Sequence, residues 1–482
     1  MTKIIKEVWF KTWPFVLFFV LGLPILVRPI SNCDELWNYN FAINVLNGHI
    51  PYKDFSIVQT PLSVYISAFI LWVFGNELIV FRLAGIFLIA VSFGLLYKII
   101  YRLSNSKMLG FIASSYAYIL IYYTWIYSYN NINLFLVLLI AYLELKITDN
   151  ESNDSKTRLL ISFIYGLILL IKQSTGVVLL ISYVIALIIG RKKSKALYLM
   201  RNISIAAIPG ILYLICLVTT GSFNEFIEYA VLGIGEFTHR IYIWESFVSA
   251  PISFLMSLFV LYVIVCSIIK IGRKQSCVSS ITHLRLLILS FAAGFVAYPL
   301  TDYYHMMVAV IPYIICLFCC VRPRTYSKNQ KLVCILITVS ILFFSSIDAL
   351  WELKSYKISN LNHYKGIPMK TLLEDNINDV NKYICLNEET KSVKVIVADE
   401  SAVAYMIPLD KYTKNFDMLL IGNLGVKTVE ELLSENKGAI YLVLRDQSAL
   451  GYQSHFELIQ YIKDNYIKIG EVRNFDAYKE KN

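Results

Sequence analysis

Long apolar segments recur along the chain from Thr12 to Ile347, and they constrain its fold more than any other feature. A helix needs about 20 apolar residues to cross the hydrocarbon core of a bilayer. Hydrophobic residues make up 57% of the 482 positions and charged residues only 16%, and the mean hydropathy is +0.59. These values exclude an ordinary soluble enzyme and predict a polytopic α-helical membrane protein.

The expected membrane spans, about eleven in number, alternate across the bilayer. The first begins at Thr12 and has no small-residue cleavage site before Arg28-Pro29, so we expect a retained helix rather than a signal peptide. The others run roughly over residues 78–100, 109–125, 132–145, 159–171, 175–189, 203–219, 250–269, 286–300, 305–320 and 332–347.

Basic residues in the loops predict the orientation of these spans. Lys3, Lys6 and Lys11 precede the first span, which places the N-terminus in the cytoplasm and the first loop outside. Later loops on the predicted cytoplasmic side are rich in Lys and Arg, whereas the predicted outer segments hold few cations. We therefore expect a multi-pass protein of the plasma (cell) membrane, with the lipid bilayer as a permanent partner.

The apolar run Leu62–Phe74 has a different expected role. It lies between Thr60-Pro61, a helix start, and Gly75-Asn76, a helix stop, and it is well short of the roughly 20 residues that a span requires. If it crossed the membrane, the cations at the end of the next span would fall outside. Length and charge both favour a helix that lies at the membrane interface.

The C-terminal segment, residues 350–482, has a different composition. It holds 17 Lys or Arg and 19 Asp or Glu, a net charge of −2, so the remainder of this +10 chain carries +12. Residues 393–398 and 439–444 are typical of buried strands, and residues 429–435 and 455–465 of helices. We expect a small extracytoplasmic α/β domain over 350–482, after a transmembrane catalytic domain over 1–349. The expected role of the C-terminal domain is acceptor docking or lid formation, and the alternative is a purely structural role.

The paired carboxylates Asp34 and Glu35 directly follow the first span. They could be a solvated pair, or Asp34 could cap a helix that starts at Leu36. In that helix Trp37 and Phe41 share an apolar face, and the neighbouring asparagines lie mostly away from it, which predicts an amphipathic helix at the interface. Because charges at membrane depth are usually functional, the pair is also a candidate active site.

Three cations stand on the predicted outer face, which is otherwise poor in them: Lys53, Arg82 and Lys172. Lys172-Gln173 interrupts an apolar run, which is costly in a membrane unless the charge is used. A lipid phosphate or diphosphate leaving group would need such partners. A lysine that only extends its ammonium group to the interface is the alternative.

Further polar clusters lie in later outer loops. Asp302 and His305 are three residues apart and could form a hydrogen-bonded pair on one helical face. Arg240 lies in an acidic outer loop and is a candidate substrate contact. The nine cysteines show no metal-ligand spacing and no disulfide framework. No metal site is therefore predicted, although a divalent cation as cofactor is left open, and no basic stripe indicates nucleic acid.

The first outer loop resembles a known family in the order of its residues. Its motif resembles the first external loop of the C-type (GT-C) glycosyltransferases. Within that class, it is similar to bacterial relatives of the protein O-mannosyltransferases and of the lipid A aminoarabinose transferases, and so resembles glycosyltransferase family 39. The residues that carry this resemblance are Asp34-Glu35, Gly48, Pro51-Tyr52, Asp54, Pro61-Leu62, Tyr65, Gly75 and Arg82. The resemblance implies a multi-helix membrane core, juxtamembrane helices in the first external loop and a sugar donor on a polyprenyl phosphate.

The resemblance also implies roles for individual residues. Asp34 matches the general base of the family, with Glu35 as its acidic neighbour. Lys172 and Arg82 resemble the cations that hold the donor phosphate, and the family resemblance extends to a His-containing turn at Asp302 and His305. Candidate substrate contacts beside these are Tyr52, Lys53, Gln173 and Arg240. The chain departs from the family at residues 127–131, where some relatives carry a second acidic residue and this chain has none.

These features predict a membrane enzyme that moves a sugar from a polyprenyl-phosphate donor to a glycan, lipid or protein acceptor of the cell envelope. The carboxylate would take the acceptor proton, fixed cations would stabilise the leaving phosphate, and attack from the opposite side would invert the anomeric centre. The alternatives are an envelope glycan polymerase or ligase that uses lipid-diphosphate oligosaccharides, a lipid-sugar flippase or transporter, and a scaffold without catalysis.

Overall fold

The structure is a computed structural model, and it divides the chain into two compact units. The bundle unit comprises Met1–Leu26, Arg82–Tyr213 and Ile241–Leu350, and the loop unit comprises Val27–Phe81, Leu214–Arg240 and Trp351–Asn482. The residues that the structure describes are 2–30, 33–122, 125, 127–147, 151–189, 195–233, 278–297, 303–320, 356–391, 393–398, 402–406, 429–446 and 456–481, with single positions between 255 and 343.

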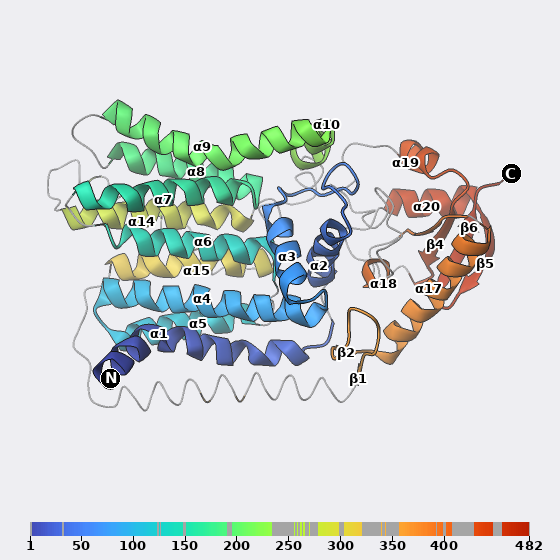
Figure 1. Cartoon of the computed structure of the whole chain (residues 1–482), viewed down its shortest axis with the longest axis horizontal. Helices are drawn as coiled ribbons and strands as arrows, with labels where there is room; N and C mark the ends of the chain where they lie inside the picture. Colours follow the sequence, from blue (N-terminus) through green and yellow to red (C-terminus); the bar gives the residue numbers. More distant parts are fainter. Residues whose placement is uncertain are drawn as a thin grey trace. The chain divides into compact units, whose positions relative to one another are not determined.

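The bundle unit consists of apolar helices that run side by side (Figure 1). Helix α14 packs against α6, α8 and α15, and α7 packs against α6 and α8. The helices are α1 (Thr2–Gly22), α4 (Leu78–Ser104), α5 (Lys107–Tyr122), α6 (Tyr129–Glu144), α7 (Glu151–Leu169), α8 (Gln173–Ile189), α9 (Lys195–Thr220), α14 (Val278–Ala293) and α15 (Tyr303–Cys320), with short 3-10 turns η1 (Leu23–Val27) and η3 (Gly294–Ala297).

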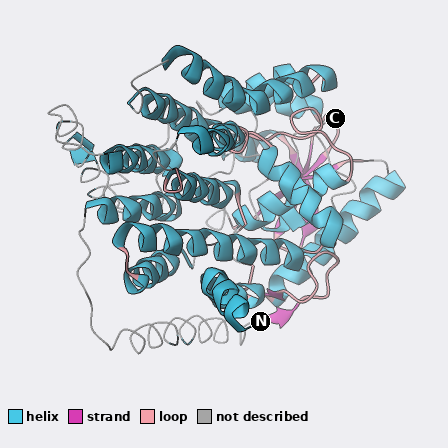
Figure 2. Cartoon of the chain, turned by 60° about the vertical axis from the view of Figure 1, so that its left-hand side comes forward, coloured by secondary structure: helices cyan, strands magenta, loops and turns pink. Residues whose placement is uncertain are grey.

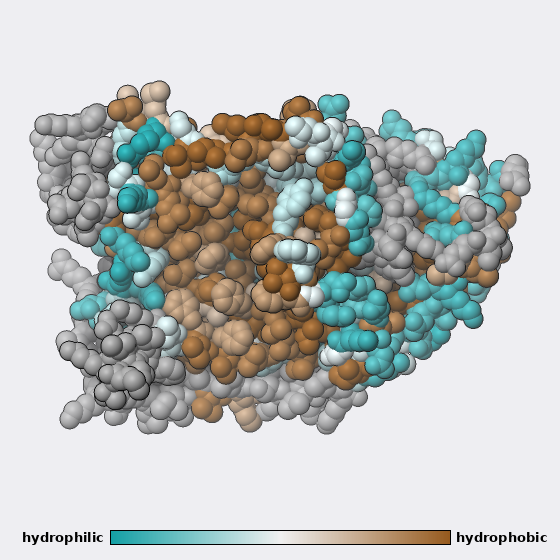
Figure 3. Space-filling view, in the orientation of Figure 1, coloured by the Kyte–Doolittle hydropathy of each residue, from teal (hydrophilic) through white to brown (hydrophobic). Residues whose placement is uncertain are grey.

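Each predicted span between residues 78 and 219 overlaps one of these helices, and the span predicted at 305–320 lies within α15. The span predicted at 286–300 overlaps the end of α14 and the turn η3, and its last three residues lie outside the described residues. The spans predicted at 250–269 and 332–347 lie largely outside the described residues. Among the described residues, Leu78–Ser104 and Ala196–Thr220 are long and apolar enough to cross a membrane, and seven further apolar helices are shorter. The predominantly helical, apolar fold is confirmed (Figure 3), whereas the number of crossings stays a prediction.

The 3-10 turn η1, which follows α1, meets the first turns of α4 at one end of the bundle. The Arg82 guanidinium donates to the carbonyl oxygens of Ile25 and Leu26, at 3.5 and 3.3 Å. The described residues of the intervening chain form α2 (Cys33–Leu46, 14 residues) and α3 (Leu62–Phe74, 13 residues), both shorter than a span of about 20 residues. The interfacial position of α3 stays a prediction.

In the loop unit, α2 packs against α3, and the C-terminal segment forms a four-stranded sheet in the order β3-β4-β6-β5. Strands β3 and β4 are parallel, and the other two pairings are antiparallel. Figure 2 colours the strands magenta and the helices cyan. The strands are β3 (Val395–Val397), β4 (Ile440–Leu444), β5 (Ile467–Val472) and β6 (Phe475–Lys479), and β1 (Lys357–Ile358) pairs separately with β2 (Pro368–Met369). The helices are α10 (Phe223–Phe226), the π-helical turn η2 (Ile227–Leu232), α17 (Thr371–Lys391), α18 (Ala402–Met406), α19 (Val429–Glu435) and α20 (Phe456–Asn465).

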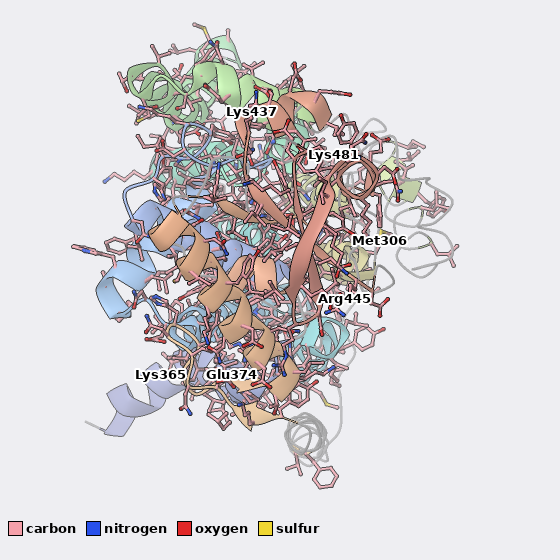
Figure 4. The ribbon with its side chains drawn as sticks, turned by 90° about the vertical axis from the view of Figure 1, so that its right-hand side faces the viewer. Met306, Lys365, Glu374, Lys437, Arg445 and Lys481 are labelled. Carbon is pink, nitrogen blue, oxygen red and sulfur yellow. The ribbon has the colours of Figure 1, made fainter. Side chains whose placement is uncertain are left out.

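Strands β3 and β4 and helices α19 and α20 lie where the sequence predicts them. The two strands are recognisable because each is a short continuous apolar run, and the two helices because apolar residues recur at helical spacing. Helix α17 and the β5–β6 hairpin were not predicted. Helix α17 carries many polar residues, and β5 is largely exposed, so neither shows a clear apolar period. Figure 4 labels Glu374 on α17 and Arg445 just after β4, two of the charged positions of this segment.

Candidate active site

Asp34 and Glu35 lie in the first turn of α2. The helix begins at Cys33, so the alternative in which Asp34 caps a helix starting at Leu36 is wrong. Glu35 is buried and Asp34 is half-buried, and the Asn38 amide donates to the backbone oxygen of Asp34 at 2.7 Å. Carboxylates in the first turn are stabilised by the positive end of the helix dipole. The turn therefore holds two carboxylates in defined positions.

Helix α2 is buried on both faces, so the prediction that its asparagine side is a polar surface is wrong. The position of α2 at the membrane interface stays a prediction. Its apolar side, with Phe41 and Trp37, is buried, and so are Asn38, Asn40 and Asn44, at 6%, 0% and 0% exposure. The asparagines do not face water because hydrogen bonds inside the protein satisfy them. A helical face that is rich in asparagine therefore does not by itself indicate exposure to water, because it can also form hydrogen bonds inside the protein.

The loop after α2 is held in an unusual conformation at Tyr52. This residue has a φ of +69°, which is uncommon for an aromatic side chain. Its backbone N–H donates to the Phe55 carbonyl at 2.8 Å, its hydroxyl donates to the Gln59 carbonyl at 2.7 Å, and its ring packs edge-on against Phe226. Tyr52 is fully buried, whereas the neighbouring Lys53 is exposed. These contacts of Tyr52 shape the loop, and substrate contact by either residue stays a prediction.

Lys172 lies at the turn between α7 and α8, and only 6% of its surface is exposed. Its ammonium group donates to the Asn130 side-chain oxygen at 3.2 Å and to the Val296 carbonyl at 2.8 Å. The hydrogen bonds join the start of α8 to the start of α6 and to η3. Gln173, half-buried, is the first residue of α8.

His305 lies in the first turn of α15, is 4% exposed and packs edge-on against Tyr304. The Tyr304 hydroxyl is 2.8 Å from the Ser128 hydroxyl, and Ser128 caps α6. The starts of α6, α8 and α15 therefore meet at one end of the bundle unit. Helix N-termini carry partial positive charge, so this end favours anions.

Arg82 is buried within α4 rather than at its first residue, and its hydrogen bonds to two carbonyl oxygens anchor η1, the turn that follows α1. These contacts are structural and do not require a substrate. Arg240 and Asp302, the other two candidate positions, lie outside the described residues. Of the predicted site residues, Asp34, Glu35, Tyr52 and Lys53 belong to the loop unit, and Arg82, Lys172, Gln173 and His305 belong to the bundle unit.

Sequence reasoning missed Asn40, Asn130 and Ser128. Asn130 and Ser128 lie in the segment Ser128-Tyr-Asn-Asn-Ile-Asn133, where asparagines open an otherwise apolar helix. Polar residues in such a helix mark internal contacts, which was a usable signal. Within the described part of the chain, no group of three or more His, Cys, Asp or Glu residues could hold a metal ion.

The bundle unit is a set of apolar helices with a buried lysine at one end, and the loop unit holds a helix that carries paired carboxylates. Residues 58–223 match the family model described as dolichyl-phosphate-mannose-protein mannosyltransferase. In fold, the chain is similar to the crystal structure of ArnT from Cupriavidus metallidurans in the apo state, with a TM-score of 0.56 at 10% identity over 99% of this chain and 98% of that one.

The crystal structure of the same ArnT bound to undecaprenyl phosphate gives a TM-score of 0.52 at 10% identity, over 98% of this chain and 97% of that one. No curated protein matches the sequence. The family match and the fold confirm the predicted resemblance to C-type glycosyltransferases. The matched family also confirms the predicted class of enzyme, a glycosyltransferase.

Proposed function

We propose that the protein is an integral-membrane glycosyltransferase that moves a sugar from a polyprenyl-phosphate donor to an acceptor of the cell envelope on the outer face. The observation that carries this proposal is the pair Asp34-Glu35 in the first turn of a buried helix. The family match supports the reaction class. The similar ArnT structure contains undecaprenyl phosphate, which supports a lipid-phosphate donor.

Asp34 is the proposed general base. An acceptor hydroxyl is a poor nucleophile, and a carboxylate within hydrogen-bond reach takes its proton as the new bond forms. The acceptor oxygen bonds to the anomeric carbon while the bond from that carbon to the phosphate oxygen breaks. The products are the glycosylated acceptor and the polyprenyl phosphate, and the direct displacement inverts the anomeric centre. Glu35 is the proposed second acidic group of this site.

The departing phosphate gains negative charge, which fixed cations stabilise. Lys172 is the proposed phosphate ligand, because hydrogen bonds to Asn130 and Val296 orient it at the start of α8. Arg82 and Lys53 are proposed as further cations of this site. Further contacts to the donor are proposed for Tyr52, Gln173, Arg240, Asp302 and His305.

The proposed topology has about eleven spans, a cytoplasmic N-terminus and an outer first loop in the plasma membrane. Residues 1–349 would form the membrane domain and residues 350–482 an extracytoplasmic domain. The acceptor is proposed to be an envelope glycan, lipid or protein. The matched family name refers to a mannosyl donor on dolichyl phosphate, and both features are consistent with a sugar carried by a lipid phosphate.

The test is mass spectrometry of envelope glycans and polyprenyl-linked sugars in cells that carry the wild type or Asp34→Asn. Asp464→Asn is the matched control, because Asp464 is an exposed residue of α20. Both variants must reach the membrane at the wild-type level. We expect Asp34→Asn alone to remove one sugar from an envelope component while its lipid-linked form accumulates. Unchanged profiles, where a deletion alters them, would refute Asp34 as the base.

A further inference from the structure

Helix α2 is joined to a segment of the loop unit that lies far away in the sequence. The Asn40 side-chain amide donates to the Tyr405 carbonyl of α18 at 3.1 Å. Asn40 is 0% and Tyr405 1% exposed, and α18 packs against α2. The contact connects the helix of the paired carboxylates to the C-terminal segment across 365 positions.

The Asn40 amide belongs to a line of side-chain hydrogen bonds along one side of α2. The Asn44 amide donates to the Asn40 side-chain oxygen at 2.9 Å, and the Asn44 oxygen is 3.0 Å from the His49 ring. Asn40 therefore uses its N–H₂ group toward Tyr405 and its oxygen toward Asn44. Both roles require an amide, and leaving one buried group unsatisfied costs about 1–3 kcal/mol.

The C-terminal segment also contacts the loop at both ends. Before α2, the Ile30 N–H donates to the Pro368 carbonyl at 3.4 Å. After α3, the Leu78 N–H donates to the His363 carbonyl at 2.8 Å. A residue before α2, the middle of α2 and the first residue of α4 are therefore each hydrogen-bonded to described residues of the segment 356–406.

A buried tyrosine of α2, Tyr39, makes a further contact with the segment 356–406. The Tyr39 hydroxyl donates to the Asn76 carbonyl, and its ring packs edge-on against Tyr364. Burial raises the pKa of Tyr39, and the nearby Tyr364 and Glu77 raise it further. The phenol therefore keeps the proton that this hydrogen bond requires.

From these contacts we propose that the C-terminal segment 356–406 is a clamp that fixes α2, and that Asn40 is a positioning residue for the carboxylates of Asp34 and Glu35. The inference rests on the proposed function of Asp34. Asn40 is six residues from Asp34, about 9 Å along a helix, so it acts through the helix and not on the substrate. A shift of about 1 Å in a catalytic group can cost about 10²-fold in rate.

The test compares Asn40→Asp with Asn360→Asp, which is the same type of substitution at an exposed position in the segment 356–406. The aspartate keeps an acceptor for Asn44 but loses the donor to Tyr405. The first readout is hydrogen exchange of the α2 amides in the purified full-length protein. The second is the initial rate of sugar transfer to membranes from a total lipid extract of the same cells, measured against the amount of extract.

We expect Asn40→Asp to speed exchange in α2 and to lower the maximal rate about 10–100-fold, with the half-saturating amount of extract changed less than about twofold. Asn360→Asp should match the wild type in both. If Asn40→Asp does not accumulate in the membrane, Asn40→Ser, which adds no charge, replaces it with the same expectation. Faster exchange with an unchanged maximal rate would overturn the positioning role, and unchanged exchange would overturn the clamp. If Asp34→Asn itself keeps wild-type transfer, the proposed function fails, and the exchange result alone still decides the clamp.

Discussion

The strongest stability prediction concerns a buried charge cluster in the bundle unit. The Arg158 guanidinium of α7 donates to the Glu144 carboxylate at the end of α6, and each residue is 4% exposed. Arg285 of α14 approaches the second carboxylate oxygen at 3.9 Å and donates to the Ala186 carbonyl of α8 at 3.2 Å. The Glu144 carboxylate therefore balances the charge of two arginines and links α6 to α7 and α14.

The substitution Glu144→Gln removes the charge and keeps the shape. It leaves the guanidinium groups of Arg158 and Arg285 without this counter-charge in a low-dielectric interior. Removing one partner of a buried pair costs about 3–5 kcal/mol, so we expect Glu144→Gln to lower the free energy of unfolding by about that amount. The nearby hydrogen bonds of Ser162 to Tyr183 and Asn202, at 2.6 and 2.8 Å, stay intact, so the loss is specific to the charge.

The assay is unfolding of the purified protein by SDS titration in mixed micelles, with Glu388→Gln as a control from the loop unit. A double variant, Glu144→Gln with Arg158→Met, should recover part of the loss, because one of the two stranded cations is gone. If Glu144→Gln unfolds within about 1 kcal/mol of the wild type, a value expected for an exposed pair, the argument from burial is refuted.

Three further predictions concern the end of the bundle unit at Lys172. Lys172→Met should weaken undecaprenyl phosphate binding at least tenfold in native mass spectrometry, whereas the control Lys146→Met should bind like the wild type. Binding by Lys172→Met equal to that of the wild type would contradict the phosphate role. Gly176→Ala should destabilise the α7–α8 turn, because a Cβ there would lie 2.4 Å from Leu169 Cα, whereas Gly210→Ala in open space should unfold at the wild-type point. Thr175→Val should stabilise the protein by about 1 kcal/mol in the same unfolding assay, since the buried hydroxyl forms no hydrogen bond with the residues that the structure describes. A loss of stability would contradict this prediction.

The membrane part of the fold is readable from the sequence because apolar length is a local signal. The helices extend beyond the predicted spans where polar residues continue the helical turns, as in α7, which begins at Glu151 rather than near residue 159. Hydropathy marks the apolar core of a helix and not its polar ends. The strands β5 and β6 escaped prediction because tertiary pairing, rather than local pattern, decides short and partly exposed strands.

Part of the candidate site could be predicted from the sequence, because it too depends on a local signal. Asp34, Glu35 and Lys172 break long apolar runs, and a charge in such a context can be recognised from neighbouring residues alone. The hydrogen-bond partners of these residues could not be recognised from neighbouring residues. Asn130 is 42 positions from Lys172, and the Val296 carbonyl is 124 positions away and carries no side-chain signal.

Asn40 shows how a contact between residues far apart in the sequence changes the functional interpretation. From the sequence alone, the asparagines of α2 suggest a surface open to water. The C-terminal segment is then interpreted as a separate lid or docking domain. Once Asn40 is seen to bond Tyr405, the same asparagines become the surface on which that segment holds the helix. A mobile lid would leave α2 intact when it opens, whereas a clamp must stay closed for the carboxylates to keep their place. The stability of the C-terminal segment and the rate of transfer should therefore change together.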